Sequence, residues 1–156
     1  MAATSTNKQP LLVDRVLHYV VDLNTAAVST IDVSGTNTAL LIVDATSTDG
    51  AIIEDIYAIS RSTSEETINL YISGASDYLR PNEGTFIGQF KSATTIGQHQ
   101  SWEGMPKILA PMPQVGSTDN QFRALYIPKG RALWAARQSD AVVANGPLLG
   151  CQGGWY

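Results

Sequence analysis

Charged residues are scarce in this chain of 156 residues: they make up 15% of it, whereas about a quarter is usual in soluble domains. The ten basic residues form no cluster, and fourteen acidic residues outnumber them, which gives a net charge of −4. Binding driven by contacts to nucleic-acid phosphates needs a basic surface, so we expect no nucleic-acid partner. A neutral polar surface suits a protein that packs against neighbours, because few charges must be desolvated. It suits many β-sandwiches equally well.

Long apolar runs and paired cysteines are also missing. No stretch approaches the roughly 18 consecutive apolar residues that a membrane span needs, and the first ten residues lack the apolar core of a signal peptide. The single cysteine, Cys151, excludes an internal disulfide, and we expect it to be a small buried hydrophobe. The prediction is a soluble protein without a membrane partner, made in a reducing cytoplasm.

β-Branched and aromatic residues in short runs predict strands. Residues 52–60 and 67–72 flank a polar turn, which is typical of two paired antiparallel strands. In the second run Ile68, Leu70 and Ile72 fall on one face, the period of a sheet with one buried face. The first run is apolar on both faces, so we expect a central strand that is covered on both sides.

Two further apolar runs, residues 11–23 and 39–45, also predict strands. Asp49 and Gly50 favour a tight turn between the second of these runs and the strand that follows it. Residues 39–60 are therefore expected to form a hairpin.

The second half of the chain shows the same signals. Residues 122–127 and 131–138 flank the turn Pro128-Lys129-Gly130, which predicts another hairpin. Residues 85–92 predict one more strand, with Phe86, Gly88 and Phe90 on one face.

These elements predict an all-β fold, an antiparallel β-sandwich or a barrel-like variant of it, in a single domain. We divide the chain into an extended N-terminal arm (residues 1–12), a β-sandwich domain (13–149) and a flexible, Gly-rich aromatic tail (150–156). Inside the domain, prolines and glycines make residues 94–121 a long irregular loop with room for a short strand at residues 107–110. Loops of this length in compact domains are usually functional or interacting.

No residue constellation for catalysis or metal binding is present in the sequence. It contains no His-Glu-x-x-His motif, no Gly-rich phosphate loop and no nucleophile elbow. His18 and His99 lie far apart without a visible partner, so we expect each to be solvated or at the edge of the core. Glu65 and Glu66 are predicted to form a solvated turn. We therefore expect no enzymatic activity, no cofactor and no metal.

The three tryptophans remain as candidates for binding. Trp134 falls in a predicted strand and is expected in the core, whereas Trp102 lies in the long loop and Trp155 in the tail. Such aromatics can anchor a protein partner, fold back over the open end of the sandwich or stack on sugar rings. We favour the first alternative and leave the others open. The candidate contacts for a partner or for self-assembly are Leu11, Leu12, Tyr78, Trp102, Met105, Met112, Trp155 and Tyr156.

The order of the apolar strand from Val16, the Asp49-Gly50 turn, residues 53–59 and 67–72, and the segment Leu125–Trp134 resembles small β-sandwich virion proteins of tailed bacteriophages. The capsid decoration, or cement, proteins are the nearest type. The resemblance spans residue 16 to the C-terminus and rests on strand order and turn placement.

This resemblance implies a homotrimer on the capsid surface of the virion, made in the host cytoplasm. It also implies the major capsid protein as partner, with arms and loops that tie neighbouring capsid subunits together. The alternative is a tail or baseplate component, or a glycan-binding β-sandwich module.

Overall fold

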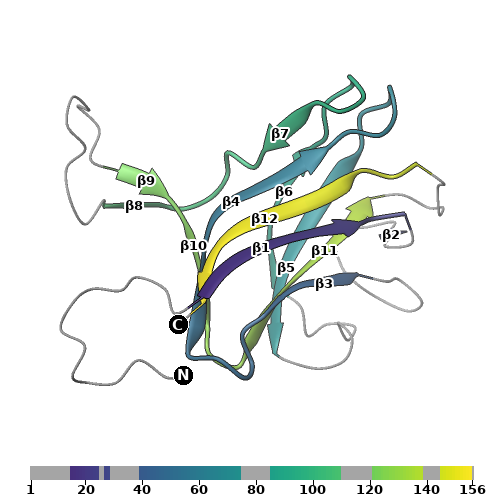
Figure 1. Ribbon diagram of the computed structural model, residues 1–156. Helices are drawn as coiled ribbons and strands as arrows, with labels where there is room; N and C mark the ends of the chain where they lie inside the picture. The colour runs from purple at the N-terminus through teal and green to yellow at the C-terminus, as the bar shows by residue number, and fades with distance from the viewer. Residues whose placement is uncertain are drawn as a thin grey trace.

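The computed structural model describes residues 15–24, 27–28, 39–74, 85–109, 121–138 and 145–155. Within these residues all regular structure is β-strand, and two five-stranded sheets pack against each other beside a small two-stranded sheet (Figure 1). The predicted all-β sandwich is therefore confirmed. The arm and five of the candidate contacts lie outside the described residues: Leu11, Leu12, Tyr78, Met112 and Tyr156.

The first sheet, sheet A, has the strand order β1-β12-β4-β10, and β7 also pairs with β4. Every pair in it is antiparallel. β10 and β7 lie on the same side of β4, one near each end of that strand. The bounds are β1 (Arg15–Asp22), β4 (Gly50–Ile59), β7 (His99–Ser101), β10 (Leu125–Pro128) and β12 (Leu148–Trp155).

The second sheet, sheet B, has the order β2-β11-β5-β6, and β3 also pairs with β11. Its pairs are antiparallel except for the two-residue contact between β2 and β11. Its strands are β2 (Ala27–Val28), β3 (Leu40–Asp44), β5 (Thr67–Gly74), β6 (Thr85–Lys91) and β11 (Arg131–Gln138). A small third sheet, β8 (Lys107–Leu109) with β9 (Gln121–Arg123), projects to one side of the sandwich (Figure 1).

The three strand pairs predicted from adjacent runs do not form. β3 and β5 belong to sheet B while β4, which lies between them in the chain, belongs to sheet A. The turn after Pro128 likewise carries the chain from β10 in sheet A to β11 in sheet B. The turns themselves form where predicted, with positive φ at Gly50 (136°) and Gly130 (79°). A tight turn reverses the chain but leaves open which sheet the next strand joins.

A bulge at Glu54 explains the apolar pattern of β4. Gln152 of β12 pairs with Asp55, and the next residue, Gly153, pairs with Ile53, so Glu54 is the extra residue. The bulge reverses the alternation halfway along the strand. As a result all four of the fully buried β4 side chains face the core: Ala51, Ile53, Ile56 and Ala58. β4 is central as predicted, but its other face is not fully covered.

Sheet B is buried on both faces at its centre. Ile68 and Leu70 of β5 face sheet A, and Asn69 and Tyr71 on the opposite face are equally buried. All side chains from Ala132 to Arg137 of β11 are buried as well, including the predicted core residue Trp134. The expectation of one buried face for β5 was therefore wrong.

β6 contains a bulge that separates its aromatic residues. Leu70 pairs with Gly88 and Tyr71 pairs with Phe86, so Ile87 is the extra residue. Phe86 turns to the outer face and meets Tyr71 edge-on at a centroid distance of 5.9 Å. The predicted common face of Phe86 and Phe90 is wrong for this reason.

The predicted flexible tail is a central strand. β12 pairs with β1 on one side and β4 on the other along its whole length. Its glycines allow close packing, because a Cβ at Gly153 would collide with the carbonyl oxygen of Ile52. The domain therefore extends to Trp155, and a boundary at residue 149 is wrong.

Candidate interaction surface on sheet A

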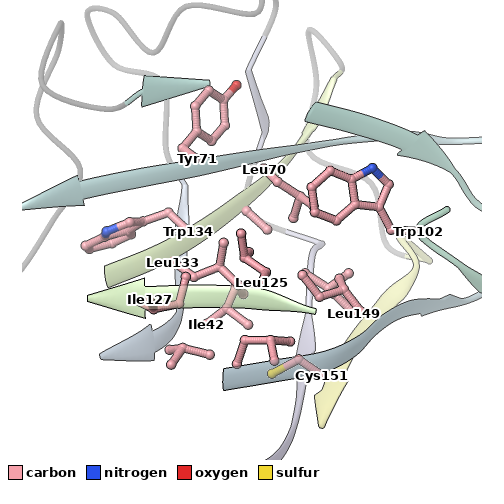
Figure 2. Close-up of a cluster of buried hydrophobic side chains, with 14 of the residues drawn as sticks. Ile42, Leu70, Tyr71, Trp102, Leu125, Ile127, Leu133, Trp134, Leu149 and Cys151 are labelled. Atoms are coloured by element: carbon pink, nitrogen blue, oxygen red, sulfur yellow. The ribbon is translucent and has the colours of Figure 1, made fainter. Parts of the chain in front are cut away.

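Trp102 is buried in this chain. Its side chain is 5% exposed and, in Figure 2, lies beside Leu70 in the cluster of buried residues. The backbone N–H of Trp102 donates to the carbonyl of Ile56 at 2.7 Å, and its ring covers Gly88, where a Cβ would lie 2.5 Å from the indole. Met105 is also buried. Of the alternatives for Trp102, the structure shows core coverage, and neither side chain offers surface to a partner.

Trp155 is only partly buried and lines a groove of about 350 Å³ between edge strands β1 and β3. Val16 and Tyr19 of β1 and Leu41 of β3 line the same groove, and all three are exposed. The structure therefore places one of the predicted contact residues at an accessible apolar site.

The outer face of sheet A carries apolar side chains in solvent. Strand register places Val16, Gly154, Ile52 and Tyr126 in one row across β1, β12, β4 and β10. Val16 is 81% exposed and Tyr126 is 53% exposed. A second row contains Val20, which is 43% exposed, with Tyr57 of β4 two strands away. No comparable solvent-facing surface exists on the described centre of sheet B.

Tyr57 joins the two histidines of the chain on this outer face. Nε2 of His18 lies 3.1 Å from the Tyr57 hydroxyl, and the ring of His99 stacks on Tyr57 with centroids 5.3 Å apart and planes at 5°. The phenol crosses β12 at Gly150, where a Cβ would lie 2.6 Å from the hydroxyl oxygen. Sequence reasoning missed this cluster, because it depends on the register of three strands. A glycine inside a strand, the sign of a close approach, was the available signal.

The His18–Tyr57–His99 cluster does not form a nucleophile relay. Among the described residues, neither histidine bonds to a serine or a cysteine. Cys151 is fully buried, and burial raises the pKa of its thiol to about 12 although a hydrogen bond from the Tyr19 backbone opposes this. Such a thiol carries almost no thiolate near neutral pH. The expectation of a small buried side chain at Cys151 is confirmed.

Charge on the outer face lies at one end of β1 and in the middle of β4, where Glu54 is exposed next to Asp55. The carboxylate of Asp22 accepts a hydrogen bond from Nη1 of Arg61 at 2.6 Å and others from Asn24. Asp55 lies in the middle of the face and accepts a long hydrogen bond of 3.4 Å from Ser101. The rows that contain Val16 and Val20 carry no charged side chain and would be cheap to desolvate.

A second, polar groove lies on the opposite open side of the sandwich, between β6 and β7. Its volume is about 650 Å³, and Trp102 forms part of its lining. Nζ of Lys91 and the carboxylate of Glu65 form an ion pair at 2.5 Å across one wall. The other polar side chains along it include three exposed glutamines and one glutamate: Gln89, Gln98, Gln100 and Glu103.

Glu66 differs from its neighbour Glu65. Its carboxylate lies 3.3 Å from Nη1 of Arg137, whose side chain is 1% exposed. The prediction of a solvated turn therefore fits Glu65 and was wrong for Glu66.

The part of the chain that the structure describes contains no group of three or more His, Cys, Asp or Glu residues arranged to hold a metal ion. In the same residues, no helix is long and apolar enough to cross a membrane. Comparison with protein-family models, with curated proteins and with solved structures finds no match for this chain.

Proposed function

We propose that this chain is a non-enzymatic structural protein of a tailed-bacteriophage virion. In this role it binds the outer capsid surface as a homotrimer and cements neighbouring subunits of the major capsid protein. The observation that supports the proposal is the outer face of sheet A, where Val16, Val20 and Tyr126 are exposed among the described residues.

The composition of this face favours binding to a protein partner. Aromatic and aliphatic side chains in a low-charge surface are typical of the centre of protein interfaces. Ile52, Tyr57 and Ile59 fill the rows between the exposed residues and are half-buried by their neighbours. The exposed side chains of Tyr126 and His18 on this face also carry groups that can donate hydrogen bonds.

The size of the face fits a contact that works in several copies. Four strands about 4.8 Å apart and eight residues of about 3.3 Å each give roughly 500 Å². A stable interface buries about 800 Å² per partner, so a single contact would be weak. Three equivalent contacts in a trimer would raise the overall affinity through avidity. A cement protein needs this behaviour, because it must hold several subunits at once.

The test is binding to purified capsids that lack a decoration protein. We expect saturable, stoichiometric binding of the unaltered chain and at least tenfold weaker binding of Tyr126→Glu, which places a charge in the outer face. Ile96→Glu is the matched control, because Ile96 is also exposed, in the loop before β7, near the end of β4 opposite to Tyr126. Failure of the unaltered chain to bind, or equal loss in both variants, would contradict the proposal. Light scattering should give a mass near three times 16.7 kDa or a whole multiple of that mass.

A second candidate function, a tail or baseplate component or glycan-binding module, is favoured by the polar groove. Side-chain amides both donate and accept hydrogen bonds, as sugar hydroxyls require. The informative variant is Gln100→Ala on a glycan array, because Gln100 is exposed in the groove. Trp102→Ala is unsuitable, since Trp102 is part of the core. Binding that Gln100→Ala abolishes would support this alternative, and a blank array would remove it.

A further inference from the structure

β1 is an edge strand without the usual protection. In the residues that the structure describes, it pairs with β12 alone, over all eight of its residues and without a register shift. Edge strands normally carry a lysine, a proline, a bulge or an inward-facing charge that prevents pairing with another chain. The six residues from Val16 to Val21 contain no Asp, Glu, Lys, Arg or Pro.

Exposed apolar side chains are concentrated at this edge. The described residues contain six exposed large apolar side chains, and four of them lie here: Val16, Tyr19, Val20 and Leu41. The first three belong to β1, and Leu41 lies across the groove on β3. An apolar, unprotected edge of this length indicates that β1 pairs with a strand of another chain in the functional state.

We propose that β1 pairs antiparallel with β1 of a second copy of this chain, about a two-fold axis beside His18. An antiparallel strand is complementary to itself under such an axis, because each backbone donor meets an acceptor of the same strand in the other copy. An unrelated strand can form the same backbone hydrogen bonds, whereas a second copy also brings the apolar side chains of β1 opposite one another by symmetry.

The outer-face pattern selects the register. Residues directly opposite each other must lie on the same side of the sheet, so the axis passes beside a residue. His18 and Tyr19 are the two central residues of β1 and give the longest overlap. The axis beside His18 places Val16 opposite Val20 of the second copy, twice, and Leu17 opposite Tyr19. The axis beside Tyr19 would place Val16 opposite Asp22, whose carboxylate is held by Arg61. The first register pairs apolar with apolar residues on both sides of a central His18 pair, and it places Arg15 opposite Val21 at the two ends. It leaves the Asp22–Arg61 ion pair outside the new contact.

The pairing goes beyond the proposed function and does not depend on it. A two-fold contact closes after two copies, so it is distinct from the three-fold contact of a trimer. It would join two copies of sheet A into one continuous sheet, whose outer face of roughly 1,000 Å² exceeds the area of a stable contact.

Single cysteine variants of the full chain test the register. Under mild oxidation we expect His18→Cys to form a covalent dimer on a non-reducing gel, because the two Cβ atoms would lie about 5 Å apart. Val20→Cys is the control, since its two copies would be roughly 14 Å apart, beyond disulfide reach. The native Cys151 is fully buried and does not interfere. Equal cross-linking of both variants, or of neither, would overturn the proposal.

Sedimentation over a range of protein concentrations provides a second measurement. The double variant Val16→Lys with Val20→Lys places lysine opposite lysine and should shift the two-copy association at least tenfold towards dissociation. Ile96→Lys, at an exposed residue away from β1, should leave it unchanged. Unchanged association of the β1 variant would show that another surface joins the copies. If the unaltered chain binds capsids but the His18→Cys variant forms no covalent dimer, this inference alone is overturned. The proposed function is then unaffected.

Discussion

Tyr57 lies across Gly150, and this contact connects three strands of sheet A. The phenol starts on β4, passes over β12 at the glycine and reaches His18 on β1, where the hydroxyl and Nε2 are 3.1 Å apart. A side chain at residue 150 would occupy the space of the ring. Glycine at residue 150 therefore permits an interaction between His18 and Tyr57, which are distant in sequence from each other and from Gly150.

Gly150→Ala should lower the free energy of unfolding by about 1–3 kcal/mol, because the added methyl group displaces the Tyr57 ring. Tyr57 can move, since the contacted atoms are at the far end of its side chain, but it then loses His18 and His99. Chemical unfolding measures the loss. In a double-mutant cycle, Tyr57→Ala should remove most of the cost of Gly150→Ala. Strictly additive losses would contradict this explanation.

Gly153→Ala should be more damaging than Gly150→Ala. The added Cβ at residue 153 would collide with the backbone carbonyl of Ile52 and not with a movable side chain. We expect a loss of at least about 3 kcal/mol, or failure to fold, because Gly153 lies opposite the bulge of β4. Thermal unfolding of both variants under identical conditions makes the comparison. A smaller loss at residue 153 than at residue 150 would show that β4 can shift.

Trp102→Ala should destabilise the chain by about 3–5 kcal/mol, because it empties the space between β6 and β7. Gln100→Ala, at an exposed residue two positions earlier, should change stability by no more than about 0.5 kcal/mol. Urea unfolding monitored by circular dichroism gives both values. A stable Trp102→Ala variant would return Trp102 to the list of surface candidates.

The thiol of Cys151 should react with iodoacetamide at pH 8 only when the chain is unfolded. Burial keeps the side chain out of solvent and raises its pKa to about 12, so the reactive thiolate is scarce in the folded state. Mass spectrometry after alkylation, with and without urea, measures the difference. Equal rates in both samples would contradict the buried position.

The same pKa shift predicts a fall in stability at high pH. The thiol has a pKa of 9.0 when unperturbed and about 12 in the folded chain. Below pH 9 both states keep the proton, so this group adds no pH dependence. Between pH 9 and 12 the unfolded chain releases a proton that the folded chain retains, so the free energy of unfolding decreases as pH rises. Unfolding of Cys151→Ala should show a shallower slope over this window, and an identical slope would contradict the shift.

Glu66→Gln should destabilise the chain by about 1–3 kcal/mol, because it removes a charged partner from the buried guanidinium of Arg137. Partial exposure of Glu66 to solvent keeps the expected loss below that of a fully buried pair. Arg137→Met should cost less in the Glu66→Gln background than in the unaltered chain. Glu65→Gln is the control, since its ion pair with Lys91 is exposed.

Local patterns predicted the elements well and their partners poorly. The runs that became β1, β3, β4, β6 and β11 were found from β-branched and aromatic content, and the turns at Gly50 and Gly130 from turn chemistry. The pairing of β4 with β5 was wrong, because a seven-residue polar connection serves a hairpin and an arch between sheets equally well. The outcome depends on which sheet can bury the apolar side of each strand.

The candidate surface shows the same limit. A partner contact was favoured for Trp102 over core coverage, yet Gly88 leaves room for its ring in the core. The glycines of β12 were taken as a sign of flexibility, whereas they pack against Tyr57 and the backbone at Ile52. Glycine gives no indication by itself of whether it serves movement or close approach, because both follow from the missing side chain.

The sequence by itself determined that this chain is all-β, that its surface is weakly charged and that its one cysteine is buried. These properties follow from residue types and from periodicity along the chain, which act over a few neighbours. Tertiary structure alone decided that the outer face of sheet A exposes apolar side chains, that β1 is an edge strand within the described residues and that His18, Tyr57 and His99 meet. Those features depend on strand order and register, which are set by packing between residues up to more than a hundred positions apart.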